Sequence, residues 1–156
     1  MTTAWEFRQM TTADLPNVME IEELCHAFPW TAGIFSDCLR VGYHCWVIHR
    51  AGEIWGYGVM STGADEAHVL NVSVHPTVRR QGAGEAMMQV FTLQAQEKGA
   101  HSLFLEVRPS NIGAMRMYEK LGYNEIGRRK NYYPAPGNGR EDAILYAKDI
   151  ITGFDP

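Results

Sequence analysis

The segment from residue 72 to residue 88 constrains the fold most, because it joins an apolar strand to a basic turn with two glycines and then to an amphipathic helix. Gly82 and Gly84 let the backbone approach a ligand without interference from side chains. The first amides of the following helix have no acceptor within that helix, and the helix dipole adds partial positive charge there. Arg79 and Arg80 add formal positive charge. The segment is therefore predicted to bind phosphate or pyrophosphate.

Two other phosphate-binding loops do not fit this segment. A nucleotide P-loop needs Lys followed by Ser or Thr after its last glycine, and a dinucleotide fold needs Gly-x-Gly-x-x-Gly at the start of the helix. Neither pattern is present. A turn that contains glycines and merely solvated arginines stays open as an alternative.

Composition indicates one domain of ordinary size. The 156 residues are 46% hydrophobic and 21% charged, which supplies enough apolar material for a core. We expect a single domain over residues 1–150 and a C-terminal tail over residues 151–156. The net charge of −4 argues against non-specific binding to nucleic acid, which depends on many contacts from lysine and arginine to phosphate.

The sequence carries no signal for export, for a membrane span or for a metal site. No stretch approaches the ~20 apolar residues of a membrane span, and the N-terminus lacks a secretory pattern, so we expect a cytoplasmic protein. Cys25, Cys38 and Cys45 are odd in number and lack Cys-x-x-Cys spacing, which favours reduced thiols. The adjacent pairs Cys25–His26 and His44–Cys45 have no second pair at ligand spacing, so no metal is expected.

Apolar patterns and turn signals predict an α/β protein. Thr12 and Thr31 are expected to cap the first two helices, and Gly99 and Gly122 to end the last two. Ala51–Glu53 is a hairpin signal. Strands are predicted at 5–8, 43–49, 54–61, 67–74, 102–107, 123–133 and 142–150, and helices at 12–25, 31–39, 84–98 and 111–121. This order indicates a sheet with helices on both faces.

A carboxylate interrupts the apolar strand at 102–107. Glu106 must be paired, solvated or functional there, because an unpaired buried charge is costly. In surroundings of low dielectric constant its pKa would rise toward neutral, which suits a general base that takes a proton from an ammonium group. A salt bridge to Arg108 or to another arginine is the alternative.

Asn111 and Tyr118 are seven residues apart and would face the same side of one helix. A phenol beside a thioester sulfur can donate its proton to the departing thiolate. The alternative for Tyr118 is core packing of an amphipathic helix together with Ala114, Met117 and Leu121.

Taken in chain order, the phosphate loop, the strand carboxylate and the helix with Asn and Tyr resemble the cofactor and catalytic segments of the GNAT N-acyltransferase superfamily. Four segments, His26–Trp30, Leu105–Asn111, Arg129–Pro134 and Gly139–Ala143, resemble the bacterial ribosomal-protein-alanine N-acetyltransferases more narrowly. The resemblance runs through almost the whole chain. It implies a GNAT fold, which is a mixed, mostly antiparallel central sheet with helices on both faces.

The resemblance also implies an activity and a set of site residues. It implies direct transfer of an acetyl group from acetyl-coenzyme A to a protein N-terminus, with the N-terminal alanine of the eighteenth small-subunit ribosomal protein as the expected acceptor. Glu106 would be the base and Tyr118 the acid, and the backbone of Val74 would pair with the pantetheine amides. Together with Arg79, the expected cofactor-binding residues are Val72, Ser73, Val74, Arg80, Gln81, Gly82, Ala83, Gly84, Glu85 and Asn111. Glu85 stands where basic residues are frequent in relatives, so its charge is expected to weaken cofactor binding.

Four aromatic residues are candidates for a peptide groove, with core positions as their alternative: Phe28, Trp30, Tyr132 and Tyr133. Two other functions stay open. One is acetylation of a small amine by the same cofactor machinery, and the other is a non-catalytic module that senses acyl-coenzyme A. The presence of both Glu106 and Tyr118 argues against the second.

Overall fold

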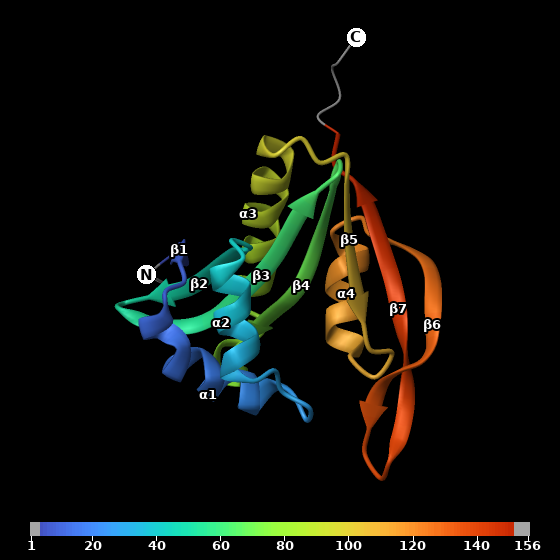
Figure 1. The fold of residues 1–156 in the computed structure, drawn as a ribbon, viewed down its shortest axis with the longest axis horizontal. Coiled ribbons are helices and arrows are strands. Elements are labelled where there is room, and N and C mark those ends of the chain that lie inside the picture. The colour runs from blue at the N-terminus through green and yellow to red at the C-terminus, as the bar shows by residue number, and fades with distance from the viewer. Residues whose placement is uncertain (1–3, 152–156) are drawn as a thin grey trace. The chain divides into compact units, whose positions relative to one another are not determined.

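The computed structural model describes residues 4–151, and its elements follow the order predicted from the sequence (Figure 1). The strands are β1 (Glu6–Gln9), β2 (His44–Arg50), β3 (Glu53–Gly63), β4 (Glu66–Val74), β5 (Ser102–Val107), β6 (Asn124–Ala135) and β7 (Gly139–Asp149). The helices are α1 (Leu15–Cys25), α2 (Ala32–Arg40), α3 (Ala83–Glu97) and α4 (Ile112–Lys120), with short 3-10 turns at Thr12–Asp14 and Pro76–Val78. Apart from residue 151, the predicted C-terminal tail lies outside the described residues.

The strands are hydrogen-bonded in the order β1-β2-β3-β4-β5-β7-β6. β4 and β5 pair in parallel, whereas β1 with β2, β2 with β3, β5 with β7 and β6 with β7 are antiparallel. The predicted mixed, mostly antiparallel sheet is confirmed. Residue contacts divide the chain into two compact units, one of residues 1–61 and 70–91 and one of residues 62–69 and 92–156. That residues 1–150 form a single domain stays a prediction.

The first unit carries helices on both faces of its strands. On one face, α1 and α2 bury Val18 and Phe35 against Val47 and Tyr57 of β2 and β3. On the other face, Gly58 makes room for α3, because a Cβ atom there would lie 2.6 Å from the ring of Phe91. Strand alternation explains both faces, since successive side chains of β3 point to opposite sides.

Local turn and cap signals in the first unit are mostly confirmed. Thr31 caps α2 by accepting a hydrogen bond from the amide of Ile34 at 3.2 Å. Ala51 and Gly52 join β2 to β3 with φ angles of 55° and 81°, the left-handed pair that a tight hairpin needs. The prediction that Thr12 caps α1 is wrong: the 3-10 turn at Thr12–Asp14 comes first, because the Asp14 carboxylate accepts from the Thr11 amide at 2.8 Å.

The second unit is built on β5, whose residues alternate between partly exposed and buried. Glu66–Val69 of β4 pair with Ser102–Leu105 on one side, and β7 pairs with β5 on the other. β6 and β7 form the predicted final antiparallel pair and extend further than predicted, to Ala135 and from Gly139. The register of β6 shifts between Arg129 and Tyr133, where Asn131 takes a φ of 51°.

Candidate active site

The predicted phosphate loop joins β4 to α3 and lies in the first unit. Arg80 and Gly82 take left-handed φ angles of 64° and 82°. The helix begins at Ala83, one residue earlier than predicted, and its fourth amide, that of Ala86, bonds to the carbonyl of Gly82 at 3.0 Å. The requirement for glycine therefore rests on Gly82, since Gly84 lies inside the helix. The amides that precede Ala86 are the ones that a helix start offers to an anion.

Two residues outside the loop hold it. The indole N–H of Trp5 donates to the carbonyl of Gln81 at 3.0 Å, and Arg50 Nη2 donates to the side-chain oxygen of the same residue at 3.0 Å. The Arg50 guanidinium also lies 3.7 Å from the centre of the Trp5 ring. Neither residue could be predicted from the sequence, because Trp5 and Arg50 lie 76 and 31 positions from Gln81 and no spacing rule connects them.

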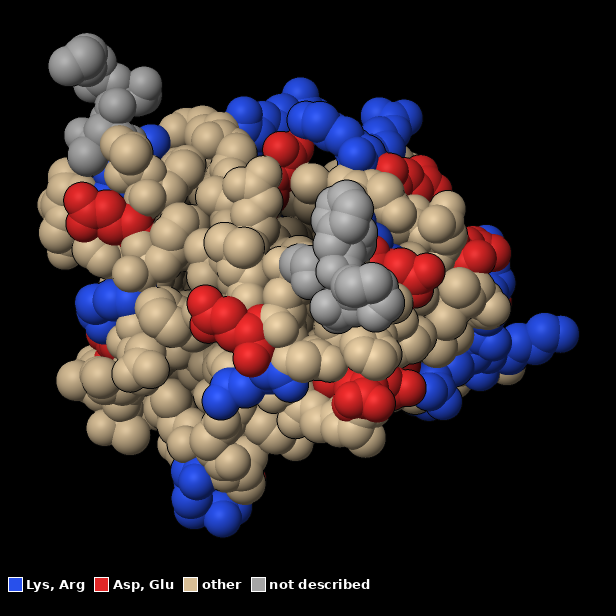
Figure 2. Space-filling view, turned by 90° about the horizontal axis from the view of Figure 1, so that it is seen from above, with Lys and Arg blue, Asp and Glu red and all other residues tan. Residues whose placement is uncertain are grey.

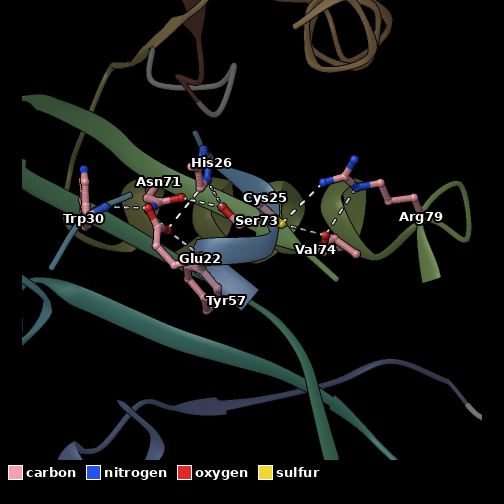
Figure 3. Close-up of polar contacts among 9 residues, drawn as sticks. All are labelled: Glu22, Cys25, His26, Trp30, Tyr57, Asn71, Ser73, Val74 and Arg79. Atoms are coloured by element: carbon pink, nitrogen blue, oxygen red, sulfur yellow. Dashed lines mark hydrogen bonds and ion pairs between the residues drawn. The ribbon is translucent and has the colours of Figure 1, made fainter. Parts of the chain in front are cut away.

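Arg79 lies against the end of β4 (Figure 3). Its Nη2 is 3.4 Å from Cys25 Sγ and its Nε is 3.5 Å from the carbonyl oxygen of Val74, which also accepts from the Cys25 thiol at 3.3 Å. Burial raises the pKa of Cys25, and the hydrogen bond from Arg79 opposes that rise. A thiol that holds its proton is a poor nucleophile, which favours direct acetyl transfer over an acetyl-cysteine intermediate.

The side chain of Ser73 is buried in the first unit. It is 5% exposed, and its side chain bonds to Asn71 at 2.7 Å and to His26 at 2.8 Å. These residues belong to a hydrogen-bonded network around the buried carboxylate of Glu22 (Figure 3). Glu22 was not predicted as a site residue, although an acidic residue on the apolar face of α1 is a visible signal in the sequence.

Glu106 lies on β5 in the second unit and is paired. Its Oε1 accepts a hydrogen bond from Arg129 Nε at 3.1 Å, and its side chain is 28% exposed. Arg108, the partner considered first, instead bonds to Glu141 at 3.0 Å and to the carbonyl of Pro134 at 2.7 Å. The salt bridge to another arginine, considered as the alternative for Glu106, is therefore present. The role of Glu106 as a base stays a prediction, and a cationic acceptor would compete with Arg129 for it.

Tyr118 projects from α4 into the core of the second unit and is 6% exposed. Its ring lies 5.7 Å from that of Tyr123 and 6.4 Å from that of Tyr146. Burial, with smaller contributions from Tyr123 and Tyr133, raises the pKa of Tyr118 well above its usual value. The phenol therefore keeps its proton at neutral pH, as a proton donor must. The packing considered as its alternative is also present.

Asn111 caps α4 and does not belong to it. Its side-chain oxygen accepts a hydrogen bond from the amide of Ala114 at 3.2 Å, and the helix begins at Ile112. The helix therefore starts one residue later than predicted, and that Asn111 and Tyr118 face the same side stays a prediction. Asparagine prefers the cap because its short side chain reaches the amides of the first turn.

The four aromatic candidates for a peptide groove differ in exposure. Phe28 is 42% exposed and Tyr132 is 48% exposed. Trp30 packs on the ring of Phe35 at 5.1 Å, and the Arg108 guanidinium lies 4.4 Å above the ring of Tyr133.

Acidic and basic side chains lie near one another on the face shown in Figure 2. Within residues 4–151, no group of three or more His, Cys, Asp and Glu side chains is placed to hold a metal ion, and Cys25, Cys38 and Cys45 are free thiols. Over the same part of the chain, none of the helices is both long and apolar enough to span a membrane.

Residues 7–123 match the family model described as the acetyltransferase (GNAT) family. The chain belongs to this family. It is thus an acetyltransferase, with acetyl-coenzyme A as its acetyl donor.

Similarity to individual family members covers nearly the whole chain. The chain is 38% identical to the ribosomal protein bS18-alanine N-acetyltransferase of Escherichia coli, over 90% of this chain and 95% of the relative. It is 37% identical to the enzyme of the same name from Haemophilus influenzae, over 89% and 94%. The crystal structure of the ribosomal-protein-S18-alanine N-acetyltransferase from Escherichia coli superposes with a TM-score of 0.86 at 36% identity, and 94% of each chain is covered.

Proposed function

We propose that this acetyltransferase modifies the N-terminal alanine of its ribosomal protein bS18. One observation carries the proposal: similarity to enzymes named for that reaction extends over about nine tenths of both chains. Because the similarity is not limited to the cofactor segment, it includes the parts of the chain that would recognise an acceptor. The proposed acceptor group is an α-ammonium, which must lose a proton before it can attack a thioester.

The proposal divides the chemistry between named residues. In the first unit, the cofactor is assigned to the backbone of Val72–Val74 and to the loop Arg79–Glu85. The left-handed turn at Gly82 and the first amides of α3 support that assignment. In the second unit, Asn111 is assigned to the cofactor through the amide group that also caps α4. Glu85, in the first turn of α3, places a carboxylate at the anion-binding end of the helix, where it opposes pyrophosphate binding.

Glu106 and Tyr118 are assigned as base and acid. Glu106 takes a proton from the α-ammonium, directly or through a water, and the neutral amine attacks the thioester carbonyl carbon. The tetrahedral intermediate collapses with cleavage of the carbon–sulfur bond, and Tyr118 protonates the departing thiolate. The nitrogen gives up its second proton as the amide forms, and a proton from solvent restores the phenol. The buried, protonated phenol supports this second assignment.

Mass spectrometry tests the proposed function. The protein is incubated with acetyl-coenzyme A and a peptide that carries the N-terminal sequence of bS18, and the position of the added acetyl group is mapped. We expect acetylation of the α-amine of alanine and little transfer to free polyamines or aminoglycosides. Transfer to small amines alone would favour the small-molecule alternative, and cofactor binding without turnover would favour a sensing module.

A further inference from the structure

Glu22 is a buried carboxylate in the first unit to which the proposed reaction assigns no role. It lies on the inner side of α1 and is 1% exposed. Its Oε1 accepts from the hydroxyl of Tyr57 at 2.6 Å and from the side-chain amide of Asn71 at 2.9 Å, and its Oε2 accepts from the backbone N–H of Trp30 at 2.8 Å (Figure 3). Three donors from three segments offset the cost of removing this carboxylate from water.

The hydrogen bonds continue from Asn71 to Ser73 and His26, and the donor of each bond can be identified. Asn71 donates its amide to Glu22, so its carbonyl oxygen accepts the hydroxyl of Ser73 at 2.7 Å. The Ser73 oxygen in turn accepts from Nε2 of His26 at 2.8 Å. The hydrogen-bond network therefore assigns a proton to Nε2 of His26, which lies 3.7 Å from Oε1 of Glu22.

The network holds both ends of the segment His26–Trp30, which links α1 to α2. One end is held through the ring of His26 on Ser73, and the other through the amide of Trp30 on Glu22. Phe28 lies between them and is 42% exposed. Through His26 and Ser73, the segment is thus hydrogen-bonded to the stretch Val72–Val74 of β4, which is assigned above to acetyl-coenzyme A.

We propose that Glu22 is a positioning residue for the acceptor peptide. By holding the segment His26–Trp30 on β4, it fixes one wall of the site in which the peptide N-terminus meets the thioester. An acceptor must approach the strand that presents the acetyl group, and this segment is hydrogen-bonded to that strand. The inference rests on the proposed function and adds to it a residue that touches neither substrate.

A glutamine cannot replace Glu22 in this network. Tyr57, Asn71 and the backbone amide of Trp30 all donate to the carboxylate, whereas a glutamine amide has one accepting oxygen and one donating nitrogen. With its oxygen towards Tyr57 and Asn71, the amide nitrogen would face the N–H of Trp30. With the amide reversed, its nitrogen would face the amide of Asn71, and the chain to Ser73 and His26 would have to reorganise. Either arrangement releases one end of the segment.

The test compares steady-state kinetics of Glu22→Gln with those of Asp14→Asn. Asp14 is a matched control because it is also a buried carboxylate: it is 7% exposed and accepts two bonds of 2.8 Å from Arg8, yet it lies just before the other end of α1. For Glu22→Gln we expect the KM for an alanine-initiated bS18 peptide to rise on the order of tenfold, with kcat and the KM for acetyl-coenzyme A within about threefold of wild type. For Asp14→Asn we expect a lower melting temperature and an unchanged peptide KM.

His26→Ala supplies a second variant, because His26 lies at the partly exposed end of the network and its loss leaves the carboxylate bonded. We expect the peptide KM of His26→Ala to rise as well. If Glu22→Gln does not fold, the result for His26→Ala decides between the outcomes. A wild-type peptide KM in the folded variants would overturn the inference and leave the proposed function standing. An equal rise in Asp14→Asn would overturn it as well, by showing a general effect of lost stability. Failure of the wild-type enzyme to acetylate the peptide would overturn the proposed function and, with it, the inference.

Discussion

Tyr118→Phe separates the proposed acid from the packing of the same side chain, because it removes one oxygen atom and keeps the ring. The ring contacts with Tyr123 and Tyr146, at 5.7 Å and 6.4 Å, are those of an aromatic core and persist in phenylalanine. The variant keeps the ring packing and loses one polar group, and a single hydrogen bond contributes only about 1 kcal/mol net to folding. We expect the free energy of unfolding to change by less than about 1 kcal/mol.

The expected kinetic effect is larger. Loss of a positioned acid lowers turnover by roughly 10²- to 10⁴-fold. Coenzyme A thiolate is a tolerable leaving group at neutral pH, so we expect the lower end, about 10²-fold, which is about 2.7 kcal/mol of transition-state stabilisation. Because the phenol of Tyr118 has its pKa raised by burial, the wild-type enzyme should keep this acid protonated throughout the neutral range.

The assay is single-turnover acetylation of the peptide, so that product release does not mask the chemical step. Calorimetry with coenzyme A should show nearly wild-type affinity. Tyr123→Phe is the matched control, since Tyr123 is a buried tyrosine in contact with Tyr118 and has no assigned role. Unaltered turnover in Tyr118→Phe, or an equal loss in Tyr123→Phe, would refute the acid assignment and leave Tyr118 as a core residue.

Three further outcomes are expected. Glu106→Gln should bind coenzyme A normally but lose roughly 10²-fold or more in turnover at pH 7, with partial recovery at high pH as free amine accumulates; unchanged turnover at pH 7 would contradict the base assignment. Gly82→Val should weaken coenzyme A binding, measured by calorimetry, roughly tenfold, because valine is strained at a φ of 82°, although no neighbouring atom blocks its Cβ; wild-type affinity would place the anion elsewhere. Burial raises the pKa of Tyr123 from 10.0 to about 12. The protonated phenol therefore contributes about 3 kcal/mol to the free energy of unfolding, which is fully present below pH 10 and is lost as the pH rises to 12. The free energy of unfolding, measured with urea at pH 8 and pH 11, should therefore fall less for Tyr123→Phe than for the wild type. Equal falls in the two proteins would contradict a raised pKa of Tyr123 in the folded state.

The sequence predicted the order of the elements, and most of their ends to within about two residues, because those features depend on neighbours a few residues apart. The cap at Thr31, the hairpin at Ala51–Gly52 and the apolar strand Ser102–Val107 each follow from a short pattern. The same locality explains two errors. Asp14 and Asn111 each hydrogen-bond to the backbone three residues away, and the helices α1 and α4 begin directly after them, later than predicted.

The site was predictable from the sequence as a set of chemical types, but the partners of its residues were not. A carboxylate within β5 was visible, whereas its pairing with Arg129 and not with Arg108 depends on how β5, β6 and β7 align. No sequence pattern predicted the hydrogen bonds that Trp5 and Arg50 donate to Gln81.

Glu22 shows most clearly what only the tertiary structure decided. The sequence placed an acidic residue on the apolar face of α1 and could not say what surrounds it. Its partners Tyr57 and Asn71 lie 35 and 49 positions away, on two strands that reach the helix only after the sheet has formed. Local patterns are set by the chain's own geometry over a few residues, so the sequence by itself determined the elements, their order and the family. The pairing of buried polar groups depends on which elements pack together, so only the folded chain determined which side chains support the site.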